Sequence, residues 1–235
     1  MKDIHNHILY GLDDGCKNED ESLEILRNII SSGVSEIVFT PHYIVDTKYM
    51  ANNREKKKAF LKLKKIIEKN NLPIKVYLGN EIFFCDNILE LIKKGEISPI
   101  NDSKCLLIEF PMMDLPHTAK SVFDELISEG YEVILAHPER YYFVKENIDI
   151  LNDFVSMGVH LQGNYTSLFG KYGRESKIIL KKLLKRGMID ILASDTHHEV
   201  IGDEKRLRRK LRWYLKEEEI DKLLFKNFDE FINNK

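Results

Sequence analysis

Short apolar runs alternate with amphipathic segments along the whole chain, and this alternation limits the possible folds more than any other feature. The apolar runs are rich in β-branched residues, and the segments between them carry apolar residues at helical spacing. About seven such β–α units follow one another, which favours a mostly parallel sheet with helices outside. The apolar runs are continuous, as is typical of strands buried on both faces. No glycine-rich dinucleotide loop follows the first run, so a barrel is the expected closure.

The same patterns give the expected element boundaries. The expected strands are Lys2–Ile4, Glu36–Thr40, Ile74–Leu78, Cys105–Ile108, Val133–Ala136, Val159–Gln162 and Ile189–Ala193. The first helix is expected from about Glu19 to Gly33, with Asn18 as its N-cap. Further helices are expected at Asn53–Lys69, Asn87–Lys94, Thr118–Glu129, Glu146–Met157, Glu175–Arg186, Glu204–Leu215 and Glu217–Ile232. Nothing in the sequence is typical of a linker, so we expect one domain over residues 1–235, with C-terminal helices from about 204.

Charge, hydropathy and cysteine content argue against a nucleic-acid-binding, membrane-spanning or disulfide-bonded protein. The formal net charge of −2 gives no overall attraction to nucleic acid. No apolar run approaches the ~20 residues needed to cross a bilayer, and the N-terminus lacks the features of a signal peptide. Cys16, Cys85 and Cys105 form no CxxC pair and no plausible disulfide framework, so a cytoplasmic protein without membrane insertion is expected. The sequence leaves the oligomeric state open.

Polar residues gather where the expected strands end. Such ends converge on one face of a parallel barrel, where active sites lie. Packing would place valine, isoleucine or leucine there, so the coincidence of acidic and histidine residues at six of these seven ends indicates a site. The residues are His5 and His7 (HNH), His42 (TPH), Glu81 (GNE), Glu109 (IEF), His137 (AHPER), and Asp195 and His197 (SDTH).

Spacing indicates that this site binds metal. Alternate residues of a strand point to one side, so His5 and His7 can hold one ion together, and Asp195 and His197 repeat the pattern. Mixed nitrogen and carboxylate ligands suit Mn²⁺, Fe²⁺ or Zn²⁺. The ligands are too many for one tetrahedral ion, which predicts two or three ions with bridging carboxylates. Arg140 can direct a bidentate fork at a bound anion such as phosphate, or else pair with Glu139.

A polynuclear metal site beside an arginine that can bind phosphate favours a metal-dependent phosphoesterase. The sequence argues against three other classes of protein. A thiolate phosphatase needs a Cys-x5-Arg loop, which is absent. An amidohydrolase also uses an HxH pair, but its carbamylated lysine has no counterpart at a strand end here. A non-catalytic metal-binding regulator stays an alternative, although the complete ligand set argues against it.

The ordered set of motifs resembles that of the PHP (polymerase and histidinol phosphatase) superfamily. The segments DIHNHILYGLDDG, EIVFTPHY, AHPERY and LQGNYTSLFGKYG are similar to those of its bacterial capsule-type, metal-dependent tyrosine-protein phosphatases. The resemblance extends from residue 2 to about 198. It implies an α/β fold, a distorted (β/α)7 PHP-type barrel.

The resemblance also implies roles for individual residues. Up to three ions, usually Mn²⁺, would be bound: the first by His5, His7, Glu81 and Asp195, the second by Glu81, Glu109 and His137, and the third by His42, His197 and Asp14. Asp13 is the alternative to Asp14. Arg140 corresponds to a phosphate-binding arginine and, with His137 and Asp195, makes up the expected catalytic set. Relatives carry a second arginine after the last motif, and Lys205, Arg206 and Arg208 are the candidates for that role.

The implied substrate is the phosphotyrosine-containing tail of a bacterial tyrosine autokinase that regulates capsular or exopolysaccharide synthesis. The alternative is another PHP phosphoesterase, acting on histidinol phosphate or a small molecule. Five tyrosines just past strand ends are candidates to wall a phenyl ring: Tyr10, Tyr43, Tyr141, Tyr142 and Tyr165. The general acid is not identified, but His117 and His198 are candidates.

Overall fold

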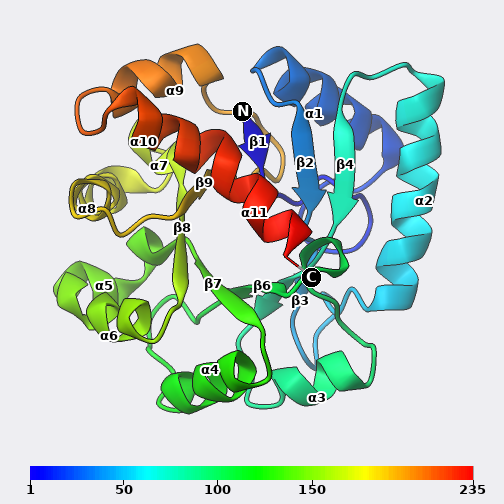
Figure 1. Cartoon of the computed structure of the whole chain (residues 1–235). Coiled ribbons are helices and arrows are strands. Elements are labelled where there is room, and N and C mark those ends of the chain that lie inside the picture. Colours follow the sequence, from blue (N-terminus) through cyan, green and yellow to red (C-terminus); the bar gives the residue numbers. More distant parts are fainter. Residues whose placement is uncertain (235) are drawn as a thin grey trace.

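Parallel strands form the centre of the protein and helices surround them (Figure 1). The structure is a computed structural model that describes residues 1–234. The expected α/β fold with a parallel sheet is confirmed. The strands are β1 (Lys2–Asp3), β2 (Glu36–Phe39), β3 (His42–Tyr43), β4 (Lys75–Leu78), β5 (Glu81–Phe83), β6 (Cys105–Glu109), β7 (Glu132–Ala136), β8 (His160–Asn164) and β9 (Ile191–Ala193).

The strands form two sheets instead of one continuous ladder. One has the order β1-β2-β4 and the other β3-β5-β6-β7-β8-β9, with parallel neighbours throughout. The chain crosses from the first sheet to the second between β2 and β3 and again between β4 and β5. The segments that follow β1 and β9 also meet: Asp195 N donates to His5 O over 2.9 Å, and His7 N donates to Thr196 O over 2.8 Å. The two sheets are therefore tied together at the carboxyl ends of their strands.

The helices form an outer ring, except for one that crosses the middle of the strands (Figure 1). No helix among residues 1–234 has the length and apolar character that crossing a membrane requires. The α-helices are α1 (Glu19–Ser31), α2 (Asn53–Lys69), α3 (Ile88–Lys93), α4 (Ala119–Ser128), α5 (Tyr142–Glu146), α6 (Leu151–Ser156), α7 (Tyr165–Phe169), α8 (Gly173–Lys185), α9 (Glu204–Leu211), α10 (Glu217–Asp221) and α11 (Asn227–Asn233).

Helix α11 covers the interior of the strands at their amino ends, where Lys2 pairs with Asp229 and Lys104 N donates to Asn234 O. Its Phe228, Phe231 and Ile232 are buried in one cluster with inward-facing strand residues. Those strand residues are Ile4, Val38, Tyr77, Cys105, Leu107, Ile134, Ala136, Ile191 and Ala193. A larger cluster packs the outer faces of the strands against the ring of helices, which explains why the strand sequences are apolar on both faces.

The strand faces that line the apolar interior also present the polar side chains at the carboxyl ends of the strands. Cys105 and Leu107 belong to the inner cluster, and Glu109 follows two residues later on the same face. Ile191, Ala193 and Asp195 repeat the arrangement at β9. Because the side chains of a strand alternate between its faces, the acidic side chains of the site lie directly beyond the apolar side chains of the interior.

Several expected boundaries were wrong. Strands β3 and β5 were not predicted, because a stretch of two or three residues is too short to show a period. The expected helix Glu146–Met157 is interrupted at Asn147, which has an extended backbone and accepts a hydrogen bond from Asp149 N through its side chain. By contrast, the expected helix Glu217–Ile232 is helical throughout, with a π-helical turn (η4, Lys222–Lys226) between α10 and α11. That residues 1–235 form a single domain stays a prediction.

Candidate metal centre

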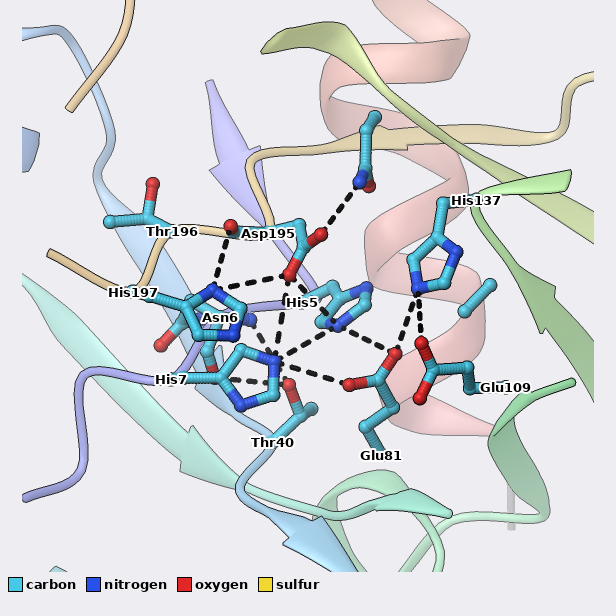
Figure 2. Close-up of polar contacts among 12 residues, drawn as sticks. His5, Asn6, His7, Thr40, Glu81, Glu109, His137, Asp195, Thr196 and His197 are labelled. Atoms are coloured by element: carbon cyan, nitrogen blue, oxygen red, sulfur yellow. Dashed lines mark hydrogen bonds and ion pairs between the residues drawn. The ribbon is translucent and has the colours of Figure 1, made fainter. Parts of the chain in front are cut away.

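Glu81, the first residue of β5, lies at the centre of the candidate site (Figure 2). Its Oε1 is 3.1 Å from His5 Nε2 and 3.0 Å from His137 Nε2. Its Oε2 is 3.2 Å from His7 Nε2 and 3.0 Å from His42 Nδ1. Glu109 lies beyond His137, with its Oε1 3.4 Å from His137 Nε2. One carboxylate thus faces four imidazoles that come from three segments of the chain.

A second group lies on the other side of His7. Asp14 Oδ1 is 3.5 Å from both His42 Nε2 and His197 Nε2. The His197 ring stacks on the His7 ring, with centroids 4.0 Å apart. Asp14, and not Asp13, therefore faces these histidines.

Asp195 joins the two groups. Its Oδ1 lies 3.6 Å from the Nε2 atoms of His5 and His7 and 3.5 Å from His197 Nδ1. Its Oδ2 accepts hydrogen bonds from Arg140 Nη1 at 2.6 Å, from Asn164 Nδ2 at 2.8 Å and from Tyr172 OH at 2.8 Å. These bonds leave one carboxylate oxygen directed at the histidines.

The rear nitrogens of the HNH pair are held by buried acceptors. His7 Nδ1 lies 2.7 Å from Asp13 Oδ2, and His5 Nδ1 lies 2.8 Å from Gln162 Oε1. Asp13 also accepts from the backbone N–H groups of His42 and Gly15. An acceptor behind an imidazole fixes its tautomer and turns the lone pair of Nε2 toward the site.

The donor set fits divalent cations. The Nε2 atoms of His5 and His7 are 3.3 Å apart and face the same carboxylates, so lone pairs and negative charge converge on one volume. His137 Nδ1 is buried without a hydrogen-bond partner among the described residues, and His42 Nδ1, although 3.0 Å from Glu81 Oε2, lacks the geometry of a hydrogen bond. Three sets of side chains bring ligand atoms within 4.8 Å of one another: His7, Asp14, His42 and His197; His5, His7 and Glu81; and His42, Glu81 and Glu109. Imidazole and carboxylate ligands in overlapping sets are typical of a polynuclear site of borderline metals.

The carboxylates of the site differ in their pKa values. Burial raises the pKa of Glu109 well above its usual value, and the nearby charge of Glu81 raises it further. Burial acts in the same direction on Glu81, but His5 and His42 overcome it and hold the pKa of Glu81 well below its usual value. Burial lowers the pKa of His137 to about 4, and the neighbouring Arg140 acts in the same direction. The neighbouring carboxylates of Glu81 and Glu109 do not ionise independently, and a cation between them would remove their repulsion.

Two site residues have a left-handed backbone. His137 has φ of 33° and Asp195 has φ of 50°, both at the point where a strand ends. Non-glycine residues in this region cost about 1–3 kcal/mol each and occur at functional sites. The turn redirects His137 away from the alternation of β7, so its ring reaches Glu81.

All nine expected metal-binding side chains meet at the carboxyl ends of the strands, with Arg140 beside them. The alternative pairing of Arg140 with Glu139 is wrong, because Glu139 is buried and accepts from Asn164 N and Ser167 Oγ instead.

Two candidates for the second phosphate-binding residue have other contacts. Arg208 pairs with Glu204, Glu217 and Asp221, and Arg206 lies over the Phe169 ring. His198 lines a cavity of about 320 Å³ beside α1, together with Cys16 and Glu21.

The sequence did not indicate the aromatic residue of the site. Tyr172 lies after α7, eight residues beyond the end of β8, and the Arg140 guanidinium carbon is 4.3 Å from the centre of its ring. Of the expected tyrosines, Tyr43, Tyr141 and Tyr165 are buried in the core instead. Gln162 and Asn164, which contact His5 and Asp195, could have been identified, because they lie two residues apart at the end of β8 and so on one face.

Comparisons with known proteins agree with this arrangement. The family described as capsular polysaccharide synthesis, CpsB/CapC, matches residues 1–233. Over 198 residues the chain is 39% identical to the putative tyrosine-protein phosphatase CapC of Staphylococcus aureus, covering 84% of this chain and 77% of that protein. It is 33% identical to the tyrosine-protein phosphatase YwqE of Bacillus subtilis, covering 84% and 78%.

One solved structure matches the whole fold. It comes from crystal structures of YwqE from Bacillus subtilis and CpsB from Streptococcus pneumoniae, described as unique metal-dependent tyrosine phosphatases. The TM-score is 0.93 at 29% identity, covering 100% of this chain and 95% of that one. Sequence, fold and site geometry lead to the same conclusion: this chain belongs to the CpsB/CapC family of capsular polysaccharide synthesis proteins.

Proposed function

We propose that this protein is a manganese-dependent protein-tyrosine phosphatase that acts on the phosphotyrosine-containing tail of a bacterial tyrosine autokinase and so regulates capsular or exopolysaccharide synthesis. The observation that carries the proposal is the convergence of five histidines and four acidic side chains on one buried volume, with Arg140 at its edge. A cytoplasmic setting is part of the proposal, since Cys16, Cys85 and Cys105 are all free thiols.

The ligands would be shared among up to three ions. His5, His7, Glu81 and Asp195 would hold the first, and Glu81, Glu109 and His137 the second. His42, His197 and Asp14 would hold the third. Such ions, when bound, supply a water of near-neutral pKa and a positive field for the phosphoryl oxygens.

Arg140 would bind the phosphoryl group. Asp195 accepts from its Nη1 and Tyr172 lies against its face, so the guanidinium is held in one orientation. A guanidinium has five N–H donors, and those not used by Asp195 can reach two phosphoryl oxygens together. Fixed donors of this kind stabilise charge that develops in the transition state.

Lys171 is the better-placed second cation for the phosphoryl group. Its Nζ donates to Asp195 O over 3.2 Å, and it precedes Tyr172 in the chain. Arg208, by contrast, is already neutralised by three carboxylates. The tyrosyl leaving group has a pKa of about 10, so its departure needs less protonation than that of a serine alkoxide.

The test is a phosphotyrosyl-peptide assay on metal-stripped protein, with Mn²⁺, Fe²⁺ and Zn²⁺ restored in turn. We expect no turnover without metal and the highest turnover with Mn²⁺. Histidinol phosphate, assayed in parallel, should be a poor substrate. Full activity after metal stripping would exclude the metal centre, and a preference for histidinol phosphate would support the alternative phosphoesterase.

A further inference from the structure

A surface formed by α8, α9 and the residues after α9 is strongly basic, and none of the candidate metal ligands belongs to it. We define the α8–α9 basic surface as Lys177, Lys181, Lys185, Arg206 and Lys210 together with Trp213 and Tyr214. Leu168 lies at its floor, and several of these side chains line a hollow of about 230 Å³. The chain as a whole has a net charge of −2, so this concentration of positive charge is local.

The cations of this surface form no ion pair with an acidic residue in the part of the chain that the structure describes. Within residues 1–234 no ion pair involves Lys177, Lys181 or Lys210, whereas the neighbouring Arg208 and Arg212 both pair with Glu217. Partial burial lowers the pKa of Lys210, and the charges of Lys177, Arg206 and Lys181 lower it further. A group of cations that repel one another is stabilised by an anionic ligand.

Aromatic rings lie among these cations. Trp213 is 81% exposed. Lys181 and Lys185 lie over the Tyr214 ring at 5.7 and 5.5 Å, and Lys210 lies over the Phe169 ring at 4.9 Å. Tyr214 is half-buried. Tryptophan and tyrosine are enriched in surfaces that bind protein partners.

The surface is continuous with the candidate metal centre. Phe169, which contacts Arg206 and Lys210, ends α7. The next residues of the same loop include Lys171 and Tyr172, and both contact Asp195. The single loop over residues 169–172 therefore contacts both Asp195 and the basic surface.

We infer that the α8–α9 basic surface binds acidic residues that flank the phosphotyrosine of the polypeptide substrate. This inference rests on the proposed function. The surface is hollowed and leads from the metal centre, which suits an extended chain better than a flat bilayer. Complementary charge at the rim of a site raises the rate of association and makes binding sensitive to salt.

The test compares the double variant Lys177→Glu/Lys181→Glu with Lys65→Glu/Lys69→Glu. Both pairs are four residues apart on a helix, and Lys65 and Lys69 are exposed on α2. At low salt we expect the first variant to raise KM about tenfold for a phosphotyrosyl peptide with acidic flanks. Its kcat for that peptide, and its activity on p-nitrophenyl phosphate and a neutral-flanked peptide, should not change. The α2 variant should match the wild type throughout.

Binding is also measured without turnover. Trp213 is the only tryptophan of the chain, so its fluorescence reports occupancy when the metal-loaded protein is titrated with a phosphonate analogue of the acidic peptide. A fluorescence change that occurs in the wild type and not in the first variant supports the inference, even if no peptide is hydrolysed. Absence of hydrolysis would count against the proposed function alone. Equal KM values in the two variants, or an equal loss on p-nitrophenyl phosphate, would overturn the inference. Loss of binding only to vesicles of phosphatidylglycerol and phosphatidylcholine would overturn it in favour of a membrane surface.

Discussion

Arg140 Nη1 donates to Asp195 Oδ2 over 2.6 Å, so the proposed phosphate-binding cation is oriented by a proposed metal ligand. The second oxygen of Asp195 faces the histidines. A change at either residue is therefore expected to disturb both parts of the site.

Replacing Arg140 by lysine keeps the charge but removes the planar fork. We expect kcat/KM for a phosphotyrosyl peptide to fall by about 100-fold or more, because a fixed transition-state donor is lost. Arg186→Lys is the matched control, since Arg186 is exposed and pairs with Asp149 on the surface. Unchanged kinetics in Arg140→Lys would show that a point charge suffices.

Removing a proposed ligand should remove metal and activity together. For His137→Ala we expect loss of bound metal, measured by mass spectrometry after gel filtration, and turnover lower by at least about 100-fold. Circular dichroism of the metal-free protein should be unchanged. His160→Ala is the control, because His160 lies near Asp190 outside the site. Normal metal content in His137→Ala would exclude it as a ligand.

Asp13 should act on the metal through His7. Burial would raise the pKa of Asp13, but the charge of His7 and their hydrogen bond lower it, so the carboxylate stays ionised behind the ring. For Asp13→Asn we expect metal affinity to fall by about 10- to 100-fold with the ligand set intact. Titration with Mn²⁺ measures this, and the exposed Asp124→Asn serves as the comparison. Equal affinities would mean that His7 needs no orienting partner.

Glu139 gives the stability a pH dependence. Burial raises its pKa to about 7 from a usual 4.5, and Oε2 has no hydrogen-bond partner among the described residues. Because the folded-state pKa is the higher one, the stabilisation is complete below pH 4.5 and is lost as the pH rises through 7, by roughly 3 kcal/mol. Urea unfolding of metal-free protein at pH 5 and pH 8 should show this fall, and Glu139→Gln should reduce it. A fall of the same size in Glu139→Gln would assign the effect to other groups.

The thiols should be dispensable for turnover. Cys16 and Cys105 are buried, and burial raises the pKa of Cys16 to about 11, so almost no thiolate forms at neutral pH. We expect the triple variant Cys16→Ala/Cys85→Ala/Cys105→Ala to keep wild-type kcat, and iodoacetamide to leave the wild type active. Inactivation that follows the loss of one cysteine would indicate a thiol mechanism.

The sequence predicted those parts of the molecule in which apolar residues repeat at strand or helix spacing. Glu109 lies two residues after the buried Leu107 on the same strand, so its direction followed from the pleat. Asp195 was predicted from the same pattern, although it lies beyond β9 and has a left-handed backbone. The turn at His137 was not predictable, because a left-handed backbone at a non-glycine residue is imposed by the surrounding contacts. Tyr172 was missed for a similar reason: α7 separates it from its strand, and only the packing of the loop returns it to Asp195.

Helix α11, which covers the interior of the strands, is the last element of the chain to be synthesised. Phe228, Phe231 and Ile232 of α11 complete a cluster whose other members are translated earlier, and the same region is tied back by the bond from Lys104 N to Asn234 O. While a ribosome still holds residues 228–232, the inner faces of these strands lack their covering. We therefore expect the docking of α11 to be the step that covers these apolar faces, after the strands have been synthesised.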